Sequence, residues 1–289
     1  MQVLIKRDDL LHPPDDLCFC GNKWRKLKYN LIQAKAAGYK QLLTFGGAYS
    51  NHIAAVASAG QLFGFSTIGI IRGEEHLPLN PTLRHAKGQG MHIHYMSRSE
   101  FRKKQEPEVL KRLEEEFGIA YVLPEGGTNA SALQGVEELV AELRAQTVID
   151  ARTSVVVSCG TGGTMAGIIL GMAGQGQVLG FPALKGDFME GEVRQLLASE
   201  GVSWENWSIH RDYHFGGYAK HKPELVTFMA DFAQQYGIKL DPIYTSKLFF
   251  GVLDLIEQGA LEVGDKVIVV HTGGLQGIKG WEERFGPFI

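Results

Sequence analysis

Residues 155–172 read Val-Val-Val-Ser-Cys-Gly-Thr-Gly-Gly-Thr-Met-Ala-Gly-Ile-Ile-Leu-Gly-Met. An apolar run, Val155–Ser158, comes first, then a glycine loop, and then the helical pattern Thr164–Met172. A strand that is buried on both faces reads as consecutive apolar residues, and glycines let the chain turn sharply after it. This stretch therefore predicts the strand–loop–helix unit from which parallel α/β sheets are built.

The same alternation of strand and helix patterns continues along the chain. The expected strands are Val3–Lys6, Leu42–Phe45, Thr67–Ile71, His92–Tyr95, Val155–Ser158, Val178–Phe181, Ser208–His210 and Val267–Val270. The expected helices are Trp24–Ala37, Asn51–Phe63, Glu108–Phe117, Ser131–Gln146, Thr164–Met172, Glu192–Ser199, Pro223–Tyr236 and Thr245–Gln258. This order predicts an α/β fold with mostly parallel sheets, in which a small domain near residues 38–126 is inserted into a larger one built from residues 1–37 and 127–289.

The composition narrows the class of protein. The chain has 289 residues, of which 44% are hydrophobic and 21% charged, as is usual for a soluble globular protein. A net charge of −3 gives no reason to expect nucleic acid or an anionic membrane as a partner. The three cysteines, Cys18, Cys20 and Cys159, form neither a disulfide framework nor a zinc-binding pattern, so we expect no metal. Without a signal-peptide pattern at its start, the chain is expected in the cytoplasm.

The glycine loop Ser158-Cys159-Gly160-Thr161-Gly162-Gly163-Thr164 is a candidate phosphate site. Backbone N–H groups at such a turn and the positive end of the following helix dipole both attract anions. A P-loop would need a lysine before Thr164, and a dinucleotide fingerprint would need a glycine at Met165, so neither motif is present. The alternative is a tight strand-to-helix turn with no ligand.

A second cluster, Gly21-Asn22-Lys23-Trp24-Arg25-Lys26-Leu27, places a lysine at the mouth of a helix. Neighbouring positive charges and the helix N-terminus favour the neutral form of Lys23, which is the nucleophile needed to form an imine. The alternative is that these basic residues form a solvated helix end.

Three further clusters follow expected strands or precede expected helices. They are Gly46-Gly47-Ala48-Tyr49-Ser50-Asn51, Asp241-Pro242-Ile243-Tyr244-Thr245 and His271-Thr272-Gly273-Gly274. Each has an ordinary interpretation, as a helix N-cap, a core tyrosine or a glycine turn. Open α/β sheets, however, bind ligands at the carboxyl ends of their strands. Taken together, the clusters favour a site for a phosphorylated aldehyde cofactor used in amino-acid chemistry.

At this point the chain resembles the pyridoxal-phosphate enzymes of the tryptophan-synthase-β fold type. It is most similar to the branch of 1-aminocyclopropane-1-carboxylate deaminase and D-cysteine desulfhydrase. The motifs that carry the resemblance, in order, are Lys-Arg-Asp-Asp at 6–9, Gly-Asn-Lys-x-Arg-Lys-Leu at 21–27, Gly-Gly-x-x-Ser-Asn at 46–51, the loop at 158–164, Asp-Pro-x-Tyr at 241–244 and His-Thr-Gly-Gly at 271–274. The resemblance implies a two-domain, three-layer α/β fold, pyridoxal 5′-phosphate as cofactor and a homodimer.

The resemblance also implies roles for individual residues. Lys23 would form the imine with the cofactor, Ser50 would act near the substrate carboxylate and in proton transfer, and Asn51 would bind the phenolic oxygen of the cofactor. Tyr244 and Tyr218 would approach the substrate. The phosphate would be held by the loop residues Cys159, Gly160, Thr161, Gly162, Gly163 and Thr164.

Two departures from the deaminase pattern bear on the reaction. The deaminase has glutamate where this chain has Thr245 and leucine where it has Thr272, whereas threonine at both positions is the desulfhydrase pattern. A carboxylate at the pyridine nitrogen makes the ring a stronger electron sink than a neutral hydroxyl does. Since opening a cyclopropane demands more of the cofactor than expelling a thiolate, we expect α,β-elimination from a small amino acid, with D-cysteine as the leading candidate.

Other interpretations remain open from the sequence. One is 1-aminocyclopropane-1-carboxylate deaminase activity, and another is a dehydratase or racemase of small hydroxy amino acids. A third is a non-catalytic protein that binds the cofactor or an amino acid. Tyr49, where the named enzymes carry glutamine, and Trp24, where they carry threonine, would add bulk beside the substrate pocket.

Overall fold

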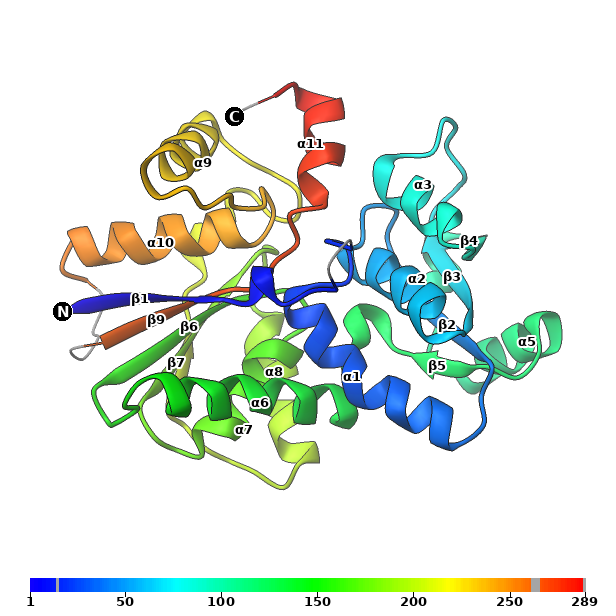
Figure 1. Ribbon diagram of the computed structural model, residues 1–289, viewed down its shortest axis with the longest axis horizontal. Helices are drawn as coiled ribbons and strands as arrows, with labels where there is room; N and C mark the ends of the chain where they lie inside the picture. Colours follow the sequence, from blue (N-terminus) through cyan, green and yellow to red (C-terminus); the bar gives the residue numbers. More distant parts are fainter. Residues whose placement is uncertain (14–15, 261–265, 288–289) are drawn as a thin grey trace.

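A computed structural model describes residues 1–13, 16–260 and 266–287 of the chain. Figure 1 shows two groups of strands with helices packed around each. The strands are β1 (Gln2–Arg7), β2 (Gln41–Gly46), β3 (Ser66–Arg72), β4 (His92–Met96), β5 (Tyr121–Leu123), β6 (Thr153–Cys159), β7 (Gln177–Pro182), β8 (Trp207–Ile209) and β9 (Lys266–His271).

The helices alternate with these strands along most of the chain. They are α1 (Gly21–Ala36), α2 (Asn51–Phe63), α3 (Pro81–Gly88), α4 (Arg98–Phe101), α5 (Pro107–Phe117), α6 (Ala130–Gln146), α7 (Gly163–Met172), α8 (Phe188–Ser199), α9 (Pro223–Tyr236), α10 (Thr245–Glu257) and α11 (Gly277–Phe285). Short 3-10 turns occur at Asp8–Leu10, Glu125–Gly127 and Asp212–His214. Within the described ranges, no helix is both long and apolar enough to cross a bilayer.

Every strand and helix expected from the sequence is present, with shifts of a few residues at the ends. The expected strand Ser208–His210, for example, is β8, Trp207–Ile209. The sequence patterns did not predict α3, α4, α11 or β5, which are short or strongly polar. Short elements carry little periodic signal, and their formation here depends on packing against neighbours.

The larger sheet has five parallel strands in the order β1-β9-β6-β7-β8. Successive side chains of β6 point to opposite faces: Val155 and Val157 pack with α6, α7 and α8, whereas Val156 packs with α9 and α10. All three valines are fully buried. Helices on both faces of the sheet thus explain the consecutive apolar residues at the start of the segment 155–172. The predicted α/β architecture is confirmed.

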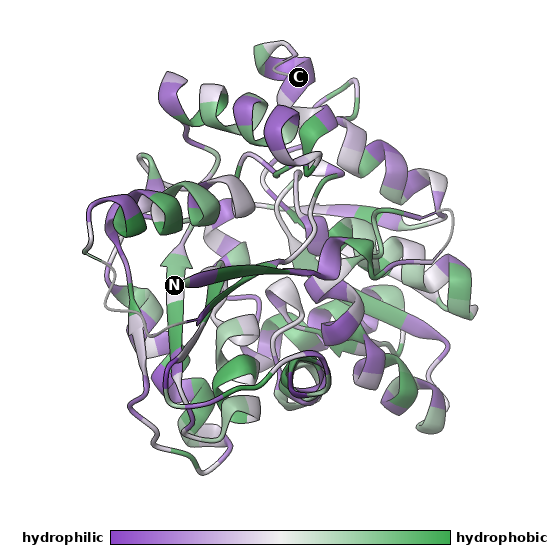
Figure 2. Ribbon diagram, turned by 60° about the vertical axis from the view of Figure 1, so that its left-hand side comes forward, coloured by the Kyte–Doolittle hydropathy of each residue, from purple (hydrophilic) through white to green (hydrophobic). Residues whose placement is uncertain are grey.

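The smaller sheet has four parallel strands in the order β4-β3-β2-β5. Leu42 faces a core shared with α1, α2 and α3, while Leu43 and Phe45 face the core under α5. Hydrophobic residues accordingly lie along the strands of both sheets, and the surrounding helices are banded with hydrophilic positions (Figure 2). The strands of this sheet fall within the predicted segment 38–126, whose limits as a domain remain a prediction.

Helix α1 connects the two sheets and packs closely on α6. The contact depends on Gly135 in α6, where a Cβ atom would lie 2.0 Å from the carbonyl oxygen of Arg25. Beside it, the buried guanidinium of Arg25 donates to Asp8 at 2.6 Å and to Glu142 at 2.8 Å. The backbone contact and the ion pairs together set the position of α1, and α1 carries the residues discussed next.

We predict that Gly135→Ala lowers the free energy of unfolding by about 2 kcal/mol, because the added methyl group must push the two helix backbones apart. The matched control is Gly191→Ala in the exposed part of α8, where a Cβ atom would have no neighbour within 4 Å. There alanine should be neutral or stabilising by up to about 1 kcal/mol. Urea denaturation measures both, and equal stabilities for the two variants would contradict the tight packing of α1 on α6.

Candidate active site

A cavity of about 720 Å³ lies between the two sheets. Its walls come from the carboxyl ends of four strands, with Gly47 following β2, Arg72 ending β3, Gly160 following β6 and Thr272 following β9. This is the place where parallel α/β sheets bind ligands. The predicted site residues that line it are Lys23, Ser50, Asn51, Cys159, Gly160, Thr161, Gly162, Gly163, Thr164, Tyr218, Tyr244 and Thr272.

Gly21 determines how Lys23 enters the cavity. It begins α1 with a φ of +57°, and a Cβ atom there would lie 2.1 Å from the carbonyl oxygen of Thr272. Only glycine permits this approach and this backbone conformation. The Asn22 N–H donates to the same carbonyl at 3.2 Å. The start of α1 is therefore held against the loop that follows β9, with Lys23 two residues further on.

The environment of Lys23 favours its neutral form. Burial lowers the pKa of the Lys23 ammonium to about 8, an effect that the nearby Cys20 opposes. The sequence predicted this direction, but it attributed the effect to neighbouring positive charges and the helix terminus, whereas loss of solvent is the main cause. At a pH near 8 about half of such amines are neutral and able to attack a carbonyl carbon.

Of the other basic residues of this segment, Arg25 is buried and Lys28 is partly exposed, and both are paired with carboxylates. Arg25 is buried in its ion pair with Asp8. Lys28 pairs with Glu138 at 2.6 Å on the outer side of α1. Each of these cations has its own carboxylate partner, which separates them from Lys23 at the cavity.

The glycine loop 158–164 leads directly into α7. Gly162 precedes the helix with a φ of +74°, and within the described part of the chain no side chain caps the first turn of α7. Gly163 faces Thr128 so closely that a Cβ atom would lie 2.7 Å from the threonine side chain. The loop thus forms a narrow cradle with N–H groups available at a helix N-terminus, which suits a phosphate group.

Hydroxyl groups line the two sides of this cradle. Thr161 Oγ1 lies 2.7 Å from Thr128 Oγ1, and the Asn22 side chain donates to Thr164 Oγ1 at 3.0 Å. Cys159 differs, because burial raises the pKa of its thiol to about 12 and its Sγ contacts Met165. We therefore expect Cys159 to contribute backbone groups and packing rather than a thiolate.

Lys26 is a site residue that the sequence analysis missed. Its ammonium is buried and donates to the Gly126 carbonyl at 2.7 Å and to Thr128 Oγ1 at 2.8 Å. Burial and the nearby Lys23 hold the pKa of Lys26 well below its usual value. The Nζ atom lies 3.1 Å from where a Gly163 side chain would start, so a phosphate in the cradle would supply the missing negative charge. The signal in the sequence was the i, i+3 spacing from Lys23, which puts both lysines on one helix face.

Ser50 and Asn51 reach the cavity from the start of α2. Ser50 Oγ accepts from the N–H groups of His52 at 3.2 Å and Ile53 at 3.3 Å, so it is also the N-cap of α2. The Asn51 side chain accepts a hydrogen bond from Gln276. This contact joins the small sheet to the segment that follows β9.

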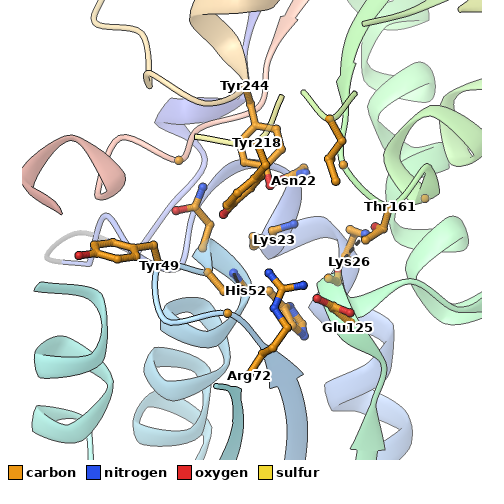
Figure 3. A pocket seen from close by; sticks show the side chains of 18 of the residues that line it. Asn22, Lys23, Lys26, Tyr49, His52, Arg72, Glu125, Thr161, Tyr218 and Tyr244 are labelled. Atoms are coloured by element: carbon orange, nitrogen blue, oxygen red, sulfur yellow. Dashed lines mark hydrogen bonds between the residues drawn. The ribbon is translucent and has the colours of Figure 1, made fainter. Parts of the chain in front are cut away.

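His52, the next residue, was also not predicted. Its Nε2 atom bonds to Thr44 Oγ1 at 2.9 Å, while its buried Nδ1 atom has no hydrogen-bond partner among the described residues. Burial, together with the charges of Lys23 and Lys26, holds the pKa of His52 well below its usual value. A neutral imidazole therefore lies near Lys23, below it in Figure 3.

Tyr218 and Tyr244 enter from the side of the large sheet and stack edge to face, with ring centroids 6.2 Å apart. Burial is the main cause that raises the pKa of both phenols. Each phenol therefore stays protonated and can donate a hydrogen bond. Tyr244 also covers the glycine loop, because a Cβ atom on Gly160 would lie 3.2 Å from its ring.

Thr245 and Thr272, the two threonines expected near the pyridine nitrogen of the cofactor, occupy different places. Thr272 lines the cavity, with its Oγ1 atom 3.5 Å from Ser158 Oγ. Thr245 is fully buried outside the lining, and its hydroxyl both donates to Asp241 Oδ1 at 2.8 Å and accepts from the Asp241 N–H at 2.7 Å. The start of α10 thus uses the Thr245 hydroxyl for its own cap, and the structure does not bring Thr245 to the cavity.

Tyr49 and Trp24, the two bulky residues that differ from the family pattern, also occupy different places. Tyr49 lines the cavity and remains 40% exposed, so it can affect which ligands enter. Trp24 packs against Phe19 in a tilted arrangement, with ring centroids 4.8 Å apart, and is not part of the cavity lining. The expected effect of Trp24 on the pocket is therefore indirect.

A group of Asp16, Cys18 and His85 near the cavity has donor atoms within 4.8 Å of one another. These atoms have other partners: Asp16 accepts from the Cys18 N–H at 2.8 Å, and His85 Nε2 lies 2.8 Å from Ser58 Oγ. Burial raises the pKa of the Cys18 thiol to about 12, which disfavours the thiolate that a metal would need. We assign no metal to this group.

The fold and cavity define an α/β protein with a phosphate-sized glycine cradle beside a buried lysine of lowered pKa. The family model described as pyridoxal-phosphate dependent enzyme matches residues 1–273. A putative 1-aminocyclopropane-1-carboxylate deaminase of Pyrococcus horikoshii is 33% identical over 95% of this chain and 85% of its own length. A mitochondrial bifunctional D-cysteine desulfhydrase/1-aminocyclopropane-1-carboxylate deaminase of Arabidopsis thaliana is 30% identical over 96% and 73%.

Among solved structures, a 1-aminocyclopropane-1-carboxylate deaminase homologue superposes with a TM-score of 0.82, at 29% identity, over 99% of this chain and 89% of its own. The chain belongs to the pyridoxal-phosphate-dependent enzymes, in the family of 1-aminocyclopropane-1-carboxylate deaminase and D-cysteine desulfhydrase. This confirms the resemblance inferred from the motifs and the cofactor. The individual site roles remain predictions, and the cavity fits the cofactor because its cradle, buried cation and lysine adjoin one another.

We predict that uptake of pyridoxal phosphate by the cofactor-free protein speeds up about tenfold per pH unit below pH 8 and levels off above it, because only the neutral Lys23 amine reacts. With a lysine of ordinary pKa, the rate of uptake would continue to rise up to a pH near 10.4. The measurement is the growth of the visible absorption band in a stopped-flow instrument. A rate that still climbs at pH 10 would contradict the burial of Lys23.

We predict that Lys26→Ala weakens the binding of pyridoxal phosphate by about 10- to 100-fold, because a charge-assisted contact with the phosphate is lost. Lys28→Ala is the matched control, since Lys28 lies on the same helix but pairs with Glu138 outside the cavity. Equilibrium dialysis gives both dissociation constants. Equal values for the two variants would remove Lys26 from the phosphate site.

Proposed function

We propose that this protein catalyses α,β-elimination from a small amino acid, with D-cysteine as the leading candidate. The reaction consumes D-cysteine and water and yields pyruvate, ammonia and hydrogen sulfide. The observation that carries the proposal is the hydroxyl pair Thr272 and Ser158 at the cavity wall, where no carboxylate accompanies them among the described residues that line that wall. A neutral partner suits the expulsion of a thiolate better than the opening of a cyclopropane ring.

The bound cofactor supplies an electron sink that stabilises negative charge at Cα. The residues of this chain supply the rest of the chemistry. The neutral Lys23 amine, freed when the substrate amine takes its place, is positioned to accept the Cα proton. The Ser50 hydroxyl, beside the N-terminal amides of α2, supports the substrate carboxylate, since an anion is stabilised at a helix N-terminus.

Tyr218 and Tyr244 serve the leaving group in this scheme. Their phenols keep their protons and project into the cavity, so either can donate to the sulfur as the C–S bond breaks. His52 remains neutral and limits the positive charge around Lys23. The electron pair of the C–S bond leaves with sulfur, and water hydrolyses the remaining enamine.

A second candidate is elimination of water from small hydroxy amino acids. It is supported by the same phenols, since a hydroxide leaving group needs a proton more than a thiolate does. Rates with D-cysteine, L-cysteine, D-serine, β-chloro-alanine and 1-aminocyclopropane-1-carboxylate separate these reactions. Efficient ring opening without elimination would overturn the proposal.

We predict that Lys23→Ala abolishes sulfide release from D-cysteine and the band at about 410–420 nm of the lysine-bound cofactor, because the amine assigned to the imine is lost. Lys28→Ala should retain both signals. Circular dichroism checks that both variants fold. Full turnover in Lys23→Ala would refute the role of this lysine, and a normal band with no sulfide from the unmodified protein would reject D-cysteine alone.

A further inference from the structure

The cavity has a basic wall on the side of the smaller sheet, formed by Arg72, Arg98, Arg102 and Lys104. Glu74 and Glu125 are the acidic groups among the described residues that line this side. Lys104 pairs with Glu125 at 3.0 Å, so one cation and one anion of this group offset each other. The wall therefore keeps a surplus of positive charge that the site chemistry described so far does not use.

Arg72 is the member of the basic wall that reaches the reactive lysine. It is the last residue of β3, and its side chain extends from the strand end toward Lys23, beside His52 and Glu125 (Figure 3). Its Nη2 atom lies 3.7 Å from the position of a Cβ atom on Gly47. Gly47 belongs to the loop that carries Ser50, so the guanidinium borders the space that the substrate would occupy.

The guanidinium of Arg72 is available for a ligand. Among the described residues it has neither a hydrogen bond nor an ion pair, in contrast to Arg25 and Lys104. The guanidinium lies against the Phe101 ring, with its carbon 5.8 Å from the ring centroid. A planar guanidinium held over a buried aromatic ring keeps its donor edge free for a bidentate anion.

The cofactor phosphate and the substrate α-carboxylate already have assigned binding groups, and neither assignment uses the basic wall. The cofactor phosphate is assigned to the glycine loop and Lys26, which Figure 3 shows to the right of Lys23, whereas Arg72 lies below it. The α-carboxylate of the substrate is assigned to Ser50 and the start of α2. Arg72 and the basic wall then remain for a further anionic group, which has to be attached to the β-carbon.

We propose that the substrates of this enzyme carry a second anionic group on the β-carbon, and that Arg72 binds that group and thereby selects them. The inference rests on the proposed elimination chemistry and names its substrate class. D-Cysteine is the smallest member, because its thiol can bind Arg72 as a thiolate. Larger members carry an oxyanion, as O-phosphoserine does.

The reaction of O-phosphoserine balances without any further reagent. The Cα–H bond breaks with its proton going to the Lys23 amine, and the Cβ–O bond breaks with its electron pair leaving on phosphate. One water molecule then hydrolyses the enamine to pyruvate and ammonia. In this scheme Arg72 faces the departing phosphate, where charge accumulates.

A competing role for Arg72 is to bind the α-carboxylate that every amino acid carries. In that case its loss would weaken all amino acids equally. A pair of ligands that differ only in the β-substituent distinguishes the two roles, and aspartate and alanine form such a pair. Neither has a good leaving group, so their binding is measured without turnover.

The first test is a titration of the holoenzyme with each enantiomer of aspartate and alanine, followed by the shift of the visible band. We expect aspartate to bind at least about tenfold more tightly than alanine, and Arg72→Gln to reduce this ratio about 10- to 100-fold through loss of a charge-assisted contact. Arg72→Lys should restore part of the ratio. Arg112→Gln, which changes an arginine paired with Glu100 outside the cavity, should leave the ratio unchanged.

The second test compares kcat/KM for O-phosphoserine and β-chloro-alanine in the same variants. The ratio should fall with Arg72→Gln as it does for binding. Equal loss for aspartate and alanine would assign Arg72 to the α-carboxylate and overturn the proposal, as would a ratio that Arg72→Gln does not move. Turnover of β-chloro-alanine without preference for anionic ligands sinks the substrate class alone, whereas absence of the cofactor band removes the proposed function itself.

Discussion

The structure of this enzyme depends on one backbone contact, the approach of Gly21 to the carbonyl of Thr272. A Cβ atom on Gly21 would come within 2.1 Å of that oxygen, so the two backbone segments meet without any side chain between them. The contact fixes the first turn of α1 against the loop after β9, and it thereby brings Lys23 to the carboxyl edge of the large sheet. Because α1 also packs on α6 and on α2, the same contact sets the small sheet relative to the lysine.

Local chemistry explains why the sequence predicted so much of this arrangement. Val155, Val156 and Val157 are apolar in succession because helices cover both faces of β6, and such runs are visible in any sequence. The glycines at 160, 162 and 163 are needed by a strand that turns at once into a helix. The class of fold and the place of Lys23 and the phosphate loop follow from patterns of this kind.

The parts that could not be predicted depend on partners distant in the chain. Lys26 reads as one of several basic residues, and its burial follows only from contacts with Gly126 and Thr128, about a hundred positions away. The pairing of His52 with Thr44 requires β2 and α2 to be packed. Thr245 had the right identity for a ring partner, but a hydroxyl at the start of a helix is more favourably bonded to Asp241.

The pairing of β1 with β9 has a consequence for folding during synthesis on the ribosome. Val3 lies opposite Val267, so the edge strand of the larger sheet pairs with a strand that is synthesised much later. The strands of the small sheet lie between residues 41 and 123, and α1, which shares its core, precedes them, so this sheet can form before β6 to β9 are synthesised. Helix α1 is synthesised before β9 and the loop that follows it, so the contact with Thr272 that anchors Lys23 can form only after that later segment has been made.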